Sequence, residues 1–427
     1  MHTTPSARAA AAQLIFGVTE GRVPLNDQIA AGALAALAPA ERARAQRLAL
    51  ASLRTLAQSD RVLKPFLRKE PPAYVRALLR LAVTEMLALG APAHGVVHEA
   101  VGLTRAHGQR TEGFAGMVNA VLRRVAATDL ALFAAEPPQQ LPAWLRGRLM
   151  SAWGKPATQA IEAAHAQGAA VDLTPRNGDG AELAAQLGGT LLPTGSVRLS
   201  GQPQISELAG FADGDWWVQD ASAACAARAL DARPGERILD LCAAPGGKTL
   251  QLAAAGAFVT ALDLSANRMV RVTENLKRCH LAAEMVVADA LNWTPDAPFD
   301  AVLLDAPCSA TGTIRRHPDL PFVRDPLGLK DLFTLQASLI DRAIGMIRPG
   351  GRLVFATCSL LPDEGERQIA AALSRHAGLA LDTAALSRLP GVDPAWISPA
   401  GGLRLRPDRW PDLGGMDGFF IAALRLG

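Results

Sequence analysis

The sequence predicts a multidomain chain with an all-α N-terminal domain, a small α+β subdomain, and an α/β domain built on a mostly parallel sheet. Three observations lead to this prediction. Apolar residues recur at helical spacing in the first part, a proline-rich stretch interrupts that pattern, and short apolar runs then alternate with amphipathic segments. With 427 residues, the chain can bury a separate core in each of two or three domains.

Residues 1–128 are expected to form the helical domain. Arg76–Leu87 places its apolar side chains three and four residues apart, as a helix that packs against a core requires. Pro71-Pro72 and Gly90-Ala91-Pro92 should separate helices, because proline lacks the amide donor and restricts the residue before it. Helical spacing also runs through Ala9–Val18, Ala45–Leu56 and Phe114–Val125.

Charge is distributed unevenly between this domain and the rest of the chain. Residues 1–128 carry 16 Lys and Arg against 8 Asp and Glu, whereas the remainder carries 27 against 32. A basic module joined to a mildly acidic one suggests that the first part helps to hold a polyanion. A basic face that is merely solvated explains the charge equally well.

A composition shift follows the helical domain. Residues 129–141, which are rich in proline and glutamine, are expected to be a linker. Residues 142–212 then form the small α+β subdomain, with a helix over Trp144–Trp153 and short strands at Ala170–Thr174 and Ser196–Ser200.

Residues 213–427 are expected to form the α/β domain. Alternating apolar runs and amphipathic segments predict parallel strands, with helices on both faces of the sheet. Ligands of such sheets bind beyond the carboxyl ends of the strands, and the residues that could carry chemistry fall there. The apolar runs are Ile238–Leu241, Phe258–Leu264, Met285–Ala288, Ala301–Leu304, Arg352–Ala356 and Phe419–Leu424.

Several classes of protein are excluded by the sequence. Its first residues lack the basic and apolar regions of a secretory signal, and no apolar stretch approaches the ~20 residues that span a bilayer. We therefore expect a cytoplasmic protein with no membrane partner. The five cysteines include no Cys-x-x-Cys pair, so we expect free thiols and no bound metal.

The first apolar run leads into a glycine-rich sequence, Cys242-Ala243-Ala244-Pro245-Gly246-Gly247-Lys248-Thr249. Glycines between a strand and a helix let a ligand approach the backbone and expose amide donors at the helix start. The last three residues also match the end of a nucleotide-binding P-loop, but that motif requires glycine where Cys242 stands. A glycine-rich turn with only a structural role is the remaining alternative.

Aspartates stand at the ends of the next apolar runs. Asp263 lies 16 residues after Gly247, roughly where an acidic side chain meets ribose hydroxyls in related folds. Asp289 ends the third run, near where an adenine would lie, and Asp305 ends the fourth. A single aspartate in such a place is more often a helix N-cap. Together, after the glycine-rich loop, they predict a cofactor that contains adenosine.

Two cysteines follow adjacent strands of the expected sheet. Cys308 lies in the loop after the fourth run, and Cys358 directly follows the fifth. A lone cysteine is usually a small buried apolar residue, but reactive groups tend to lie in loops after strands. Cys225, Cys242 and Cys279 lack such a pairing and are expected to be structural.

These motifs together resemble a known family. Leu241–Thr249, Asp305–Gly312 and Thr357–Ser359 are similar to motifs of the NOL/NOP/Sun family of RNA cytosine-5 methyltransferases. Thr313–Leu320 and Gly116–Arg124 resemble the bacterial branch of that family, and so does Ala310, where other members have glycine. The resemblance implies a NusB-like RNA-binding domain at residues 1–128. It also implies a Rossmann-like methyltransferase domain, S-adenosylmethionine as methyl donor, and small-subunit (16S) ribosomal RNA as partner.

The chemistry of that family explains why it needs a thiolate. Carbon 5 of cytosine is a poor nucleophile, and a thiolate added to carbon 6 makes it enamine-like and reactive. The resemblance implies that Cys358 is the nucleophile, that Cys308 assists release, and that Lys248 and Asp305 lie near the base. Cys308 is the rival nucleophile, because DNA cytosine methyltransferases attack with a Pro-Cys cysteine. The cofactor-contacting positions implied by the resemblance are Cys242, Ala243, Ala244, Pro245, Gly246, Gly247, Lys248, Asp263, Asp289 and Asp305.

Arg315, Arg316 and His317 follow Cys308 in a loop that we expect to contact RNA. An ordinary solvated loop is the alternative. Two other functions stay open for the whole chain. One is the same reaction on transfer RNA or another RNA, and the other is a non-catalytic RNA-binding assembly factor.

Overall fold

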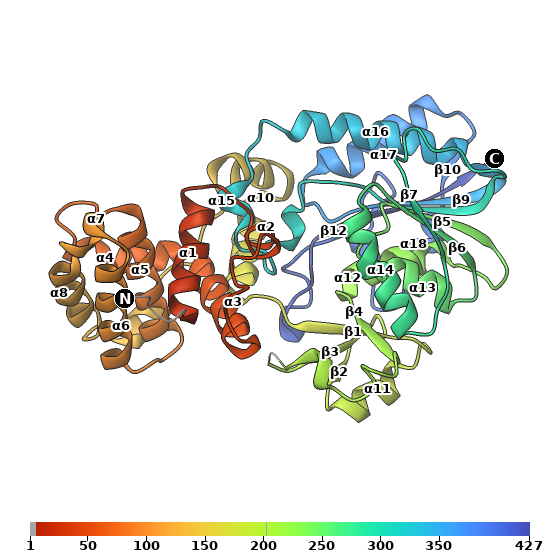
Figure 1. Cartoon of the computed structure of the whole chain (residues 1–427). Coiled ribbons are helices and arrows are strands. Elements are labelled where there is room, and N and C mark those ends of the chain that lie inside the picture. Colours follow the sequence, from red (N-terminus) through yellow and green to blue (C-terminus); the bar gives the residue numbers. More distant parts are fainter. Residues whose placement is uncertain (1–5, 202) are drawn as a thin grey trace. The chain divides into compact units, whose positions relative to one another are not determined.

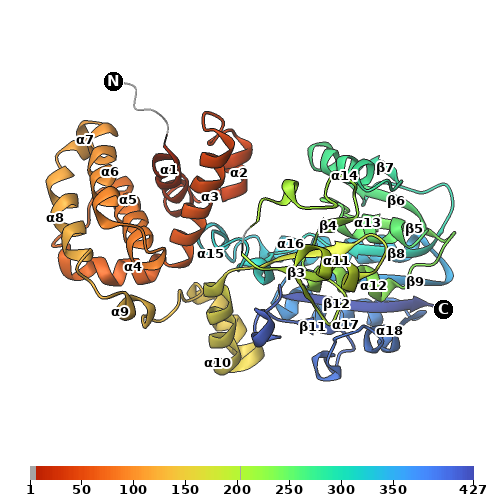
Figure 2. The ribbon, with the colours of Figure 1, turned by 90° about the horizontal axis from the view of Figure 1, so that it is seen from below.

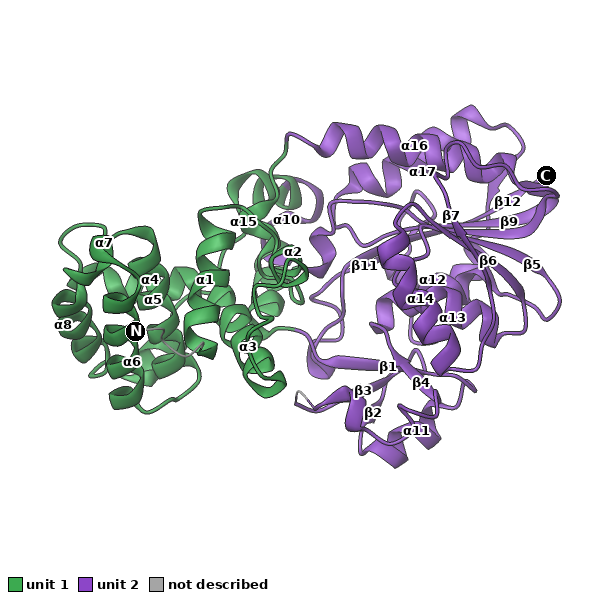
Figure 3. Ribbon diagram, viewed as in Figure 1, with its two compact units in different colours: residues 1–150, 158–168, 314–326 green, residues 151–157, 169–313, 327–427 purple. Residues whose placement is uncertain are grey.

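A computed structural model describes residues 6–201 and 203–427. The chain divides into two compact units (Figure 3). Unit 1 comprises residues 1–150, 158–168 and 314–326, and unit 2 comprises residues 151–157, 169–313 and 327–427.

Unit 1 is helical, and its helices form where apolar side chains recur at helical spacing. All four segments that we expected to be helical lie in helices. Pro72 and Pro92 each stand just before a helix, where a missing amide donor costs nothing. The helices are α1 Ala7–Thr19, α2 Leu25–Ala30, α3 Pro39–Arg54, α4 Leu56–Leu63, α5 Ala73–Val83, α6 Ala93–Ala106, α7 Gln109–Glu112, α8 Ala115–Val125, α9 Leu130–Ala134, part of α10 Ala143–Gln167, and α15 Leu320–Val323, with short turns at Lys64–Phe66 and Thr84–Ala88.

A segment from the second half of the sequence completes unit 1. The Asp319 carboxylate accepts a hydrogen bond from the backbone N–H of Leu25 at 2.9 Å, and both groups are buried. Phe322 and Val323, in α15, pack against the apolar cluster formed by α1, α3 and α5. Residues 314–326 therefore belong to the helical unit, although they follow the loop that carries Cys308.

Unit 2 contains a small antiparallel sheet with the strand order β2-β3-β1-β4. The two strands that we expected in this region are confirmed as β1 and β3. The sheet also takes in β4, which lies beyond residue 212, where we placed the end of the subdomain. Its elements are β1 Val171–Pro175, α11 Gly180–Leu187, β2 Thr190–Leu191, β3 Val197–Leu199, a 3-10 turn at Ile205–Glu207, and β4 Trp216–Val218.

The larger sheet of unit 2 has the strand order β10-β12-β9-β8-β5-β6-β7, with β11 paired to β12. The strands from β9 to β7 in this order are parallel, whereas β12 runs antiparallel to β9. All six apolar runs form strands, as predicted, and β10 and β11 are additional. The strands are β5 Arg237–Leu241, β6 Phe258–Asp263, β7 Glu284–Val287, β8 Phe299–Asp305, β9 Ile347–Thr357, β10 Leu379–Leu381, β11 Leu403–Leu405 and β12 Phe419–Leu426.

Helices cover both faces of this sheet (Figures 1 and 2). One apolar cluster joins one face to α12 and α18, and a second cluster joins the other face to α16 and α17. Because β5, β6, β8 and β9 are parallel, the loops that follow them leave the sheet at the same edge. The helices are α12 Ala221–Leu230, α13 Gly247–Ala254, α14 Ala266–Arg278, α16 Leu329–Gly345, α17 Glu366–Arg375 and α18 Thr383–Ser387, with 3-10 turns at Thr311–Thr313, Pro362–Glu364, Pro394–Trp396 and Pro411–Leu413.

In the described ranges, no helix combines the length and the apolar character that crossing a membrane requires.

Candidate active site

The two cysteines that follow β8 and β9 lie against each other. The Sγ atoms of Cys308 and Cys358 are 3.4 Å apart, and both side chains are half-buried. Backbone hydrogen bonds join the two loops, from Ala306 N to Ala356 O at 2.9 Å and from Gly312 N to Cys358 O at 3.0 Å. The pairing of β8 with β9 thus brings together two thiols that are 50 residues apart in the sequence.

The environment of Cys308 favours its protonated form. The hydrogen bond with Cys358 raises the pKa of Cys308 well above its ordinary value, and burial adds to this shift. The negative charges of Cys358 and Glu364 act in the same direction. At neutral pH, Cys308 is therefore a thiol that can donate a hydrogen bond to the Cys358 sulfur.

Lys248 and Asp305 form an ion pair at the same edge. Lys248 Nζ lies 2.6 Å from Asp305 Oδ2, and it also lies 5.2 Å from the centre of the Phe419 ring. Burial opposes the charged ammonium, but Asp305 outweighs it and leaves the pKa of Lys248 raised. Lys248 therefore stays charged at neutral pH. Its ammonium lies near Cys358, and the interaction with Cys358 also raises the pKa of Lys248.

The glycine-rich loop between β5 and α13 has a backbone conformation and close contacts that favour glycine. Gly246 has φ of +103°, and a Cβ there would lie 3.0 Å from the Val272 side chain. Cys242 also has a positive φ, of +62°, which non-glycine residues rarely adopt. Bare backbone at the start of α13 fits the close approach of an adenosine-containing cofactor.

The other two expected cofactor residues differ in their surroundings. The buried Asp263 carboxylate accepts hydrogen bonds from Ala244 N at 3.2 Å and from Ser265 N at 2.9 Å, so it joins the ends of β5 and β6. Asp289 is exposed and caps its own turn by accepting from Leu291 N at 3.0 Å. Asp263 lies at the carboxyl end of β6, and Asp289 lies just after β7.

Asp240 is a buried carboxyl that sequence reasoning missed. It is fully buried in β5, and its Oδ2 accepts a hydrogen bond from Thr249 Oγ1 at 2.6 Å. Its Oδ1 has no hydrogen-bond partner among the residues that the structure describes. Burial raises its pKa to about 7. No sequence signal distinguished this residue, because it lies inside an apolar run.

A polar cluster directly behind the two cysteines was also missed. Its centre is Glu364, which is fully buried and accepts hydrogen bonds from Ser309 and Ser359. These two serines directly follow Cys308 and Cys358. The only sequence signal was the serine after each cysteine, and nothing in the sequence joined those serines to Glu364.

The structure corrects the RNA-contact expectation for Arg315. Its side chain is fully buried, with an exposed fraction of 0%, so its guanidinium cannot reach an RNA phosphate. Arg54 donates a hydrogen bond to its carbonyl at 3.0 Å. Arg316 and His317 are half-buried, and burial lowers the pKa of His317.

The remaining cysteines lie away from the pair. Cys225 and Cys279 are buried, and burial raises the pKa of Cys225 and of Cys242 to about 12. Within residues 6–201 and 203–427, no group of three or more His, Cys, Asp or Glu residues is arranged to hold a metal ion.

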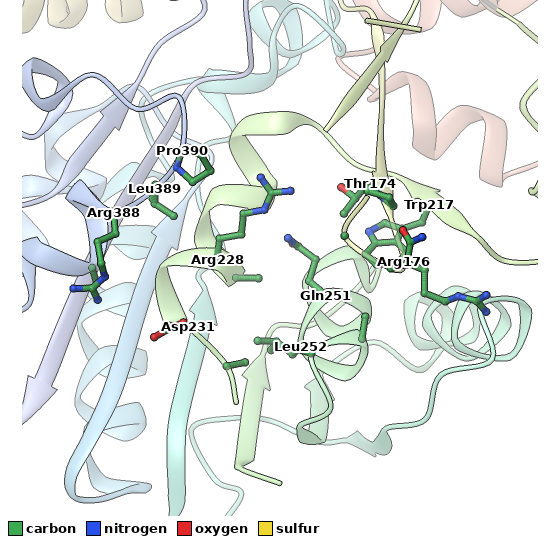
Figure 4. A pocket seen from close by; sticks show the side chains of 18 residues that line it. Thr174, Arg176, Trp217, Arg228, Asp231, Gln251, Leu252, Arg388, Leu389 and Pro390 are labelled. Atoms are coloured by element: carbon green, nitrogen blue, oxygen red, sulfur yellow. The ribbon is translucent and has the colours of Figure 1, made fainter. Parts of the chain in front are cut away.

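A separate cavity of about 580 Å³ lies between α12, α13, α18 and β1 (Figure 4). Arg228 and Arg176 both line it, and Arg176 forms an ion pair with Asp215 at 3.2 Å. In Figure 4 the guanidinium groups of Arg176, Arg228 and Arg388 point in different directions. Neither reactive cysteine lines this cavity, so it is distinct from the site described above.

Comparison with known proteins matches both units of the chain. The family model described as 16S rRNA methyltransferase RsmB/F matches residues 227–425, and the NusB family model matches residues 5–127. The chain is 34% identical to "Ribosomal RNA small subunit methyltransferase B" of Erwinia tasmaniensis over 99% of each chain. It is 36% identical to the protein of that name from Xanthomonas campestris, over 98% of this chain and 97% of the relative.

Solved structures also resemble this one. A crystal structure of a methyltransferase homologue from Pyrococcus horikoshii has a TM-score of 0.55 and 27% identity, and the match covers 67% of this chain and all of that one. The crystal structure of PH0851 has a TM-score of 0.73 and 24% identity over 99% of each chain, which supports the fold.

Proposed function

Since the chain belongs to the RsmB/F family of 16S rRNA methyltransferases, we propose that it methylates its target cytosine through a covalent bond from Cys358 to carbon 6. The enzyme is an S-adenosylmethionine-dependent RNA methyltransferase, and its product is 5-methylcytosine in small-subunit ribosomal RNA. The proposal adds which side chains carry out the reaction and how.

One observation carries the assignment of the nucleophile. The two sulfurs are 3.4 Å apart, and the surroundings of Cys308 raise its pKa and keep its proton on. A thiol that donates to its neighbour stabilises a thiolate there. The ammonium of Lys248 also lies close enough to Cys358 to interact with it electrostatically. The thiolate is the nucleophilic form of cysteine, so Cys358 is the better nucleophile of the pair.

The bonds change in three steps. Cys358 Sγ bonds to carbon 6, and the electron pair of the double bond between carbons 5 and 6 moves onto the ring. Carbon 5 then bonds to the methyl carbon, whose bond to the sulfonium sulfur of the donor would break and leave the donor as a neutral thioether. Loss of the proton from carbon 5 restores the double bond, breaks the bond from sulfur to carbon 6, and returns Cys358 as a thiolate.

Cys308 is suited to take part in the last step. Its pKa is raised partly by the negative charge on Cys358. Once Cys358 is bonded to carbon, it carries no charge, so the pKa of Cys308 falls and its proton can leave to solvent. Cys308 can then accept the proton from carbon 5 and so promote release.

Lys248 and Asp305 are proposed to hold the base edge and to stabilise charge that develops on the ring.

S-adenosylmethionine supplies an electrophilic methyl group when it is bound. The glycine-rich loop at residues 242–247 and the carboxylates of Asp263 and Asp289 are the groups that would hold it. The enclosed cysteines require a cytosine that is single-stranded or turned out of its helix.

Two further expectations belong to this proposal. We propose that the enzyme acts in the cytoplasm on RNA without a bound metal. Arg316 and His317 are our candidates for contacts with nucleotides that flank the target, whereas the buried Arg315 is not.

The proposal is tested by incubating the purified protein and S-adenosylmethionine with unmodified 16S rRNA and, separately, with transfer RNA. Mass spectrometry of nucleosides should detect 5-methylcytosine in the ribosomal RNA. RNA that carries 5-fluorocytosine should trap the enzyme, because fluorine on carbon 5 cannot leave as a proton. Peptide mapping should place the adduct on Cys358.

Each outcome decides between the readings that the sequence left open. An adduct on Cys308 would reverse the proposed roles. Product only in transfer RNA would keep the mechanism and replace the substrate. If neither product nor adduct forms, either with naked RNA or with partly assembled small subunits, the result would favour a binding factor without catalysis.

A further inference from the structure

Glu364 is a buried carboxylate that joins the two cysteine loops. It lies in the turn Pro362–Glu364 after Cys358, and its exposed fraction is 0%. Its Oε1 accepts hydrogen bonds from Ser309 N at 2.8 Å and from Gln336 Nε2 at 3.0 Å. Its Oε2 accepts from the hydroxyls of Ser309 and Ser359.

These contacts reach both loops at the residues next to the reactive sulfurs. Ser309 directly follows Cys308, and Ser359 directly follows Cys358. The two serine hydroxyls are themselves 3.2 Å apart. Gln336, also fully buried, donates a second hydrogen bond to the Pro307 carbonyl at 2.8 Å. One side chain thus holds the backbone on both sides of the sulfur pair.

The charge of Glu364 is not balanced by a cation. In the part of the chain that the structure describes, no Lys, Arg or His forms an ion pair with it. Hydrogen bonds from four donors replace the water that a buried carboxylate loses, and such burial is costly without them. Its charge acts on the cysteines as well, since it helps to raise the pKa of Cys308.

We propose that Glu364 is a positioning residue of the methyl-transfer reaction: it holds the two cysteine loops together, sets the spacing of the two sulfurs, and places a carboxylate near Cys308. It does not touch substrate, and it acts through Ser309, Ser359 and the field at Cys308. The inference rests on the proposed roles of Cys358 and Cys308. Its closing experiment therefore includes a measurement that does not depend on activity.

Sulfur spacing can be measured with phenylarsine oxide, in which one arsenic bonds to the sulfurs of two thiols, and its oxygen leaves as water with the two thiol protons. The wild-type protein should take up one arsenical across Cys308 and Cys358, as seen in the intact mass. Glu364→Asp keeps the charge, but its chain is one methylene shorter and cannot reach both loops. We expect that variant to bind the arsenical at least tenfold more weakly.

Charge is separated from spacing by Glu364→Gln, which has nearly the same shape. Without the negative charge, the pKa of Cys308 should fall, so its alkylation by iodoacetamide should begin at lower pH than in the wild type. Peptide mass spectrometry follows Cys308 and Cys358 separately. We expect about 10- to 100-fold lower turnover in both Glu364 variants, with little change in KM for RNA.

Single hydrogen bonds are removed by Ser359→Ala and Ser309→Ala, which are expected to fold even if a Glu364 variant does not. Ser359→Ala should slow formation of the adduct on 5-fluorocytosine RNA. Ser309→Ala should form the adduct at the normal rate and slow product release. Glu236→Gln serves as the control, because Glu236 pairs with Arg352 at 2.6 Å, at the start of β5, and contacts neither cysteine loop.

The outcomes separate this inference from the proposed function. Normal arsenical binding and an unchanged pH profile for Cys308 in both Glu364 variants would overturn the positioning role, whatever their activity. A Glu236→Gln variant with the same losses would also overturn it, because the effect would then be general destabilisation. Failure of the wild-type protein to form an adduct would instead overturn the proposed function and leave the spacing measurement standing.

Discussion

At the scale of single residues, the sulfurs of Cys308 and Cys358 are 3.4 Å apart. The strand pattern predicted that both would follow adjacent strands, and the structure brings them together. The sequence could not predict the raised pKa of Cys308, because that depends on the hydrogen bond with Cys358 and on burial. The same limit applies to Arg315. Its sequence neighbourhood indicated an exposed loop, but its side chain is buried.

Substitution of each cysteine should give a different defect. Cys358→Ala removes the nucleophile, so we expect neither adduct nor 5-methylcytosine. Cys308→Ala leaves the nucleophile, so the adduct should form and persist because release is impaired. Gel mobility of the protein–RNA adduct and nucleoside mass spectrometry measure the two steps. Cys225→Ala is the control: it removes another buried thiol and should keep both adduct formation and 5-methylcytosine production. If Cys308→Ala abolishes the adduct and Cys358→Ala traps it, the roles of the two cysteines are reversed.

Asp240 should make the stability of unit 2 depend on pH. Burial raises its pKa from 3.8 to about 7, so the folded protein keeps this proton at pH values where the unfolded chain has lost it. Asp240 therefore contributes most to the free energy of unfolding below about pH 4. This contribution falls by up to ~1.4 kcal/mol for each pH unit as the pH rises toward 7.

Urea unfolding of the wild type and Asp240→Asn, followed by tryptophan fluorescence, tests this sign. Six of the seven tryptophans lie in unit 2. The free energy of unfolding of the wild type, minus that of Asp240→Asn, should decrease between pH 4 and 7 and level off above pH 7. A difference that stays constant over this range would contradict a raised pKa.

At the scale of elements, the sequence predicted all six apolar runs of the large sheet and also β1 and β3, whereas it did not predict β2, β4, β10 and β11. The apolar runs that became β5 to β9 and β12 are long enough to show a pattern, whereas β10 and β11 have three residues each. Sequence pattern also could not assign residues 314–326 to the helical unit. That assignment depends on tertiary contacts such as the one between Asp319 and Leu25.

That contact should stabilise unit 1. Asp319→Ala leaves the buried N–H of Leu25 without its acceptor, which costs about 1–3 kcal/mol. Hydrogen exchange of the amides in α2 should accelerate, and the melting temperature of unit 1 should fall. Asp325→Ala, in the same segment, is the control. Its carboxylate is 43% exposed and lies 3.9 Å from Arg22, so its loss should cost much less. Equal effects of the two changes would argue against the buried contact as the cause.

At the scale of the whole molecule, the sequence predicted an N-terminal helical domain and a C-terminal α/β domain, and the NusB and RsmB/F matches fall on those two parts. It left open whether the excess positive charge of residues 1–128 helps to hold a polyanion or is only a solvated face. The family matches do not test the role of this charge, because a basic surface attracts RNA through its electrostatic field and not through a fixed sequence motif.

Salt dependence of RNA binding tests the role of this charge. Arg123 and Arg124 are exposed at the end of α8. Changing both to Glu should weaken binding and lower the slope of log affinity against log salt by up to ~0.9 for each lost phosphate contact. Arg233→Glu alters an exposed arginine of unit 2 and should leave the slope unchanged. If the double variant keeps the wild-type slope, the charge of residues 1–128 is a solvated face.

The placement of residues 314–326 in unit 1 has a consequence for synthesis on the ribosome. The chain emerges from its N-terminus, so α1 to α9 leave the exit tunnel while α15 is still nearly 200 residues from being made. Until then, the amide of Leu25 lacks its acceptor and the apolar cluster of α1, α3 and α5 lacks Phe322 and Val323. The last contacts of the helical unit can therefore form only after β1 to β8 have been translated.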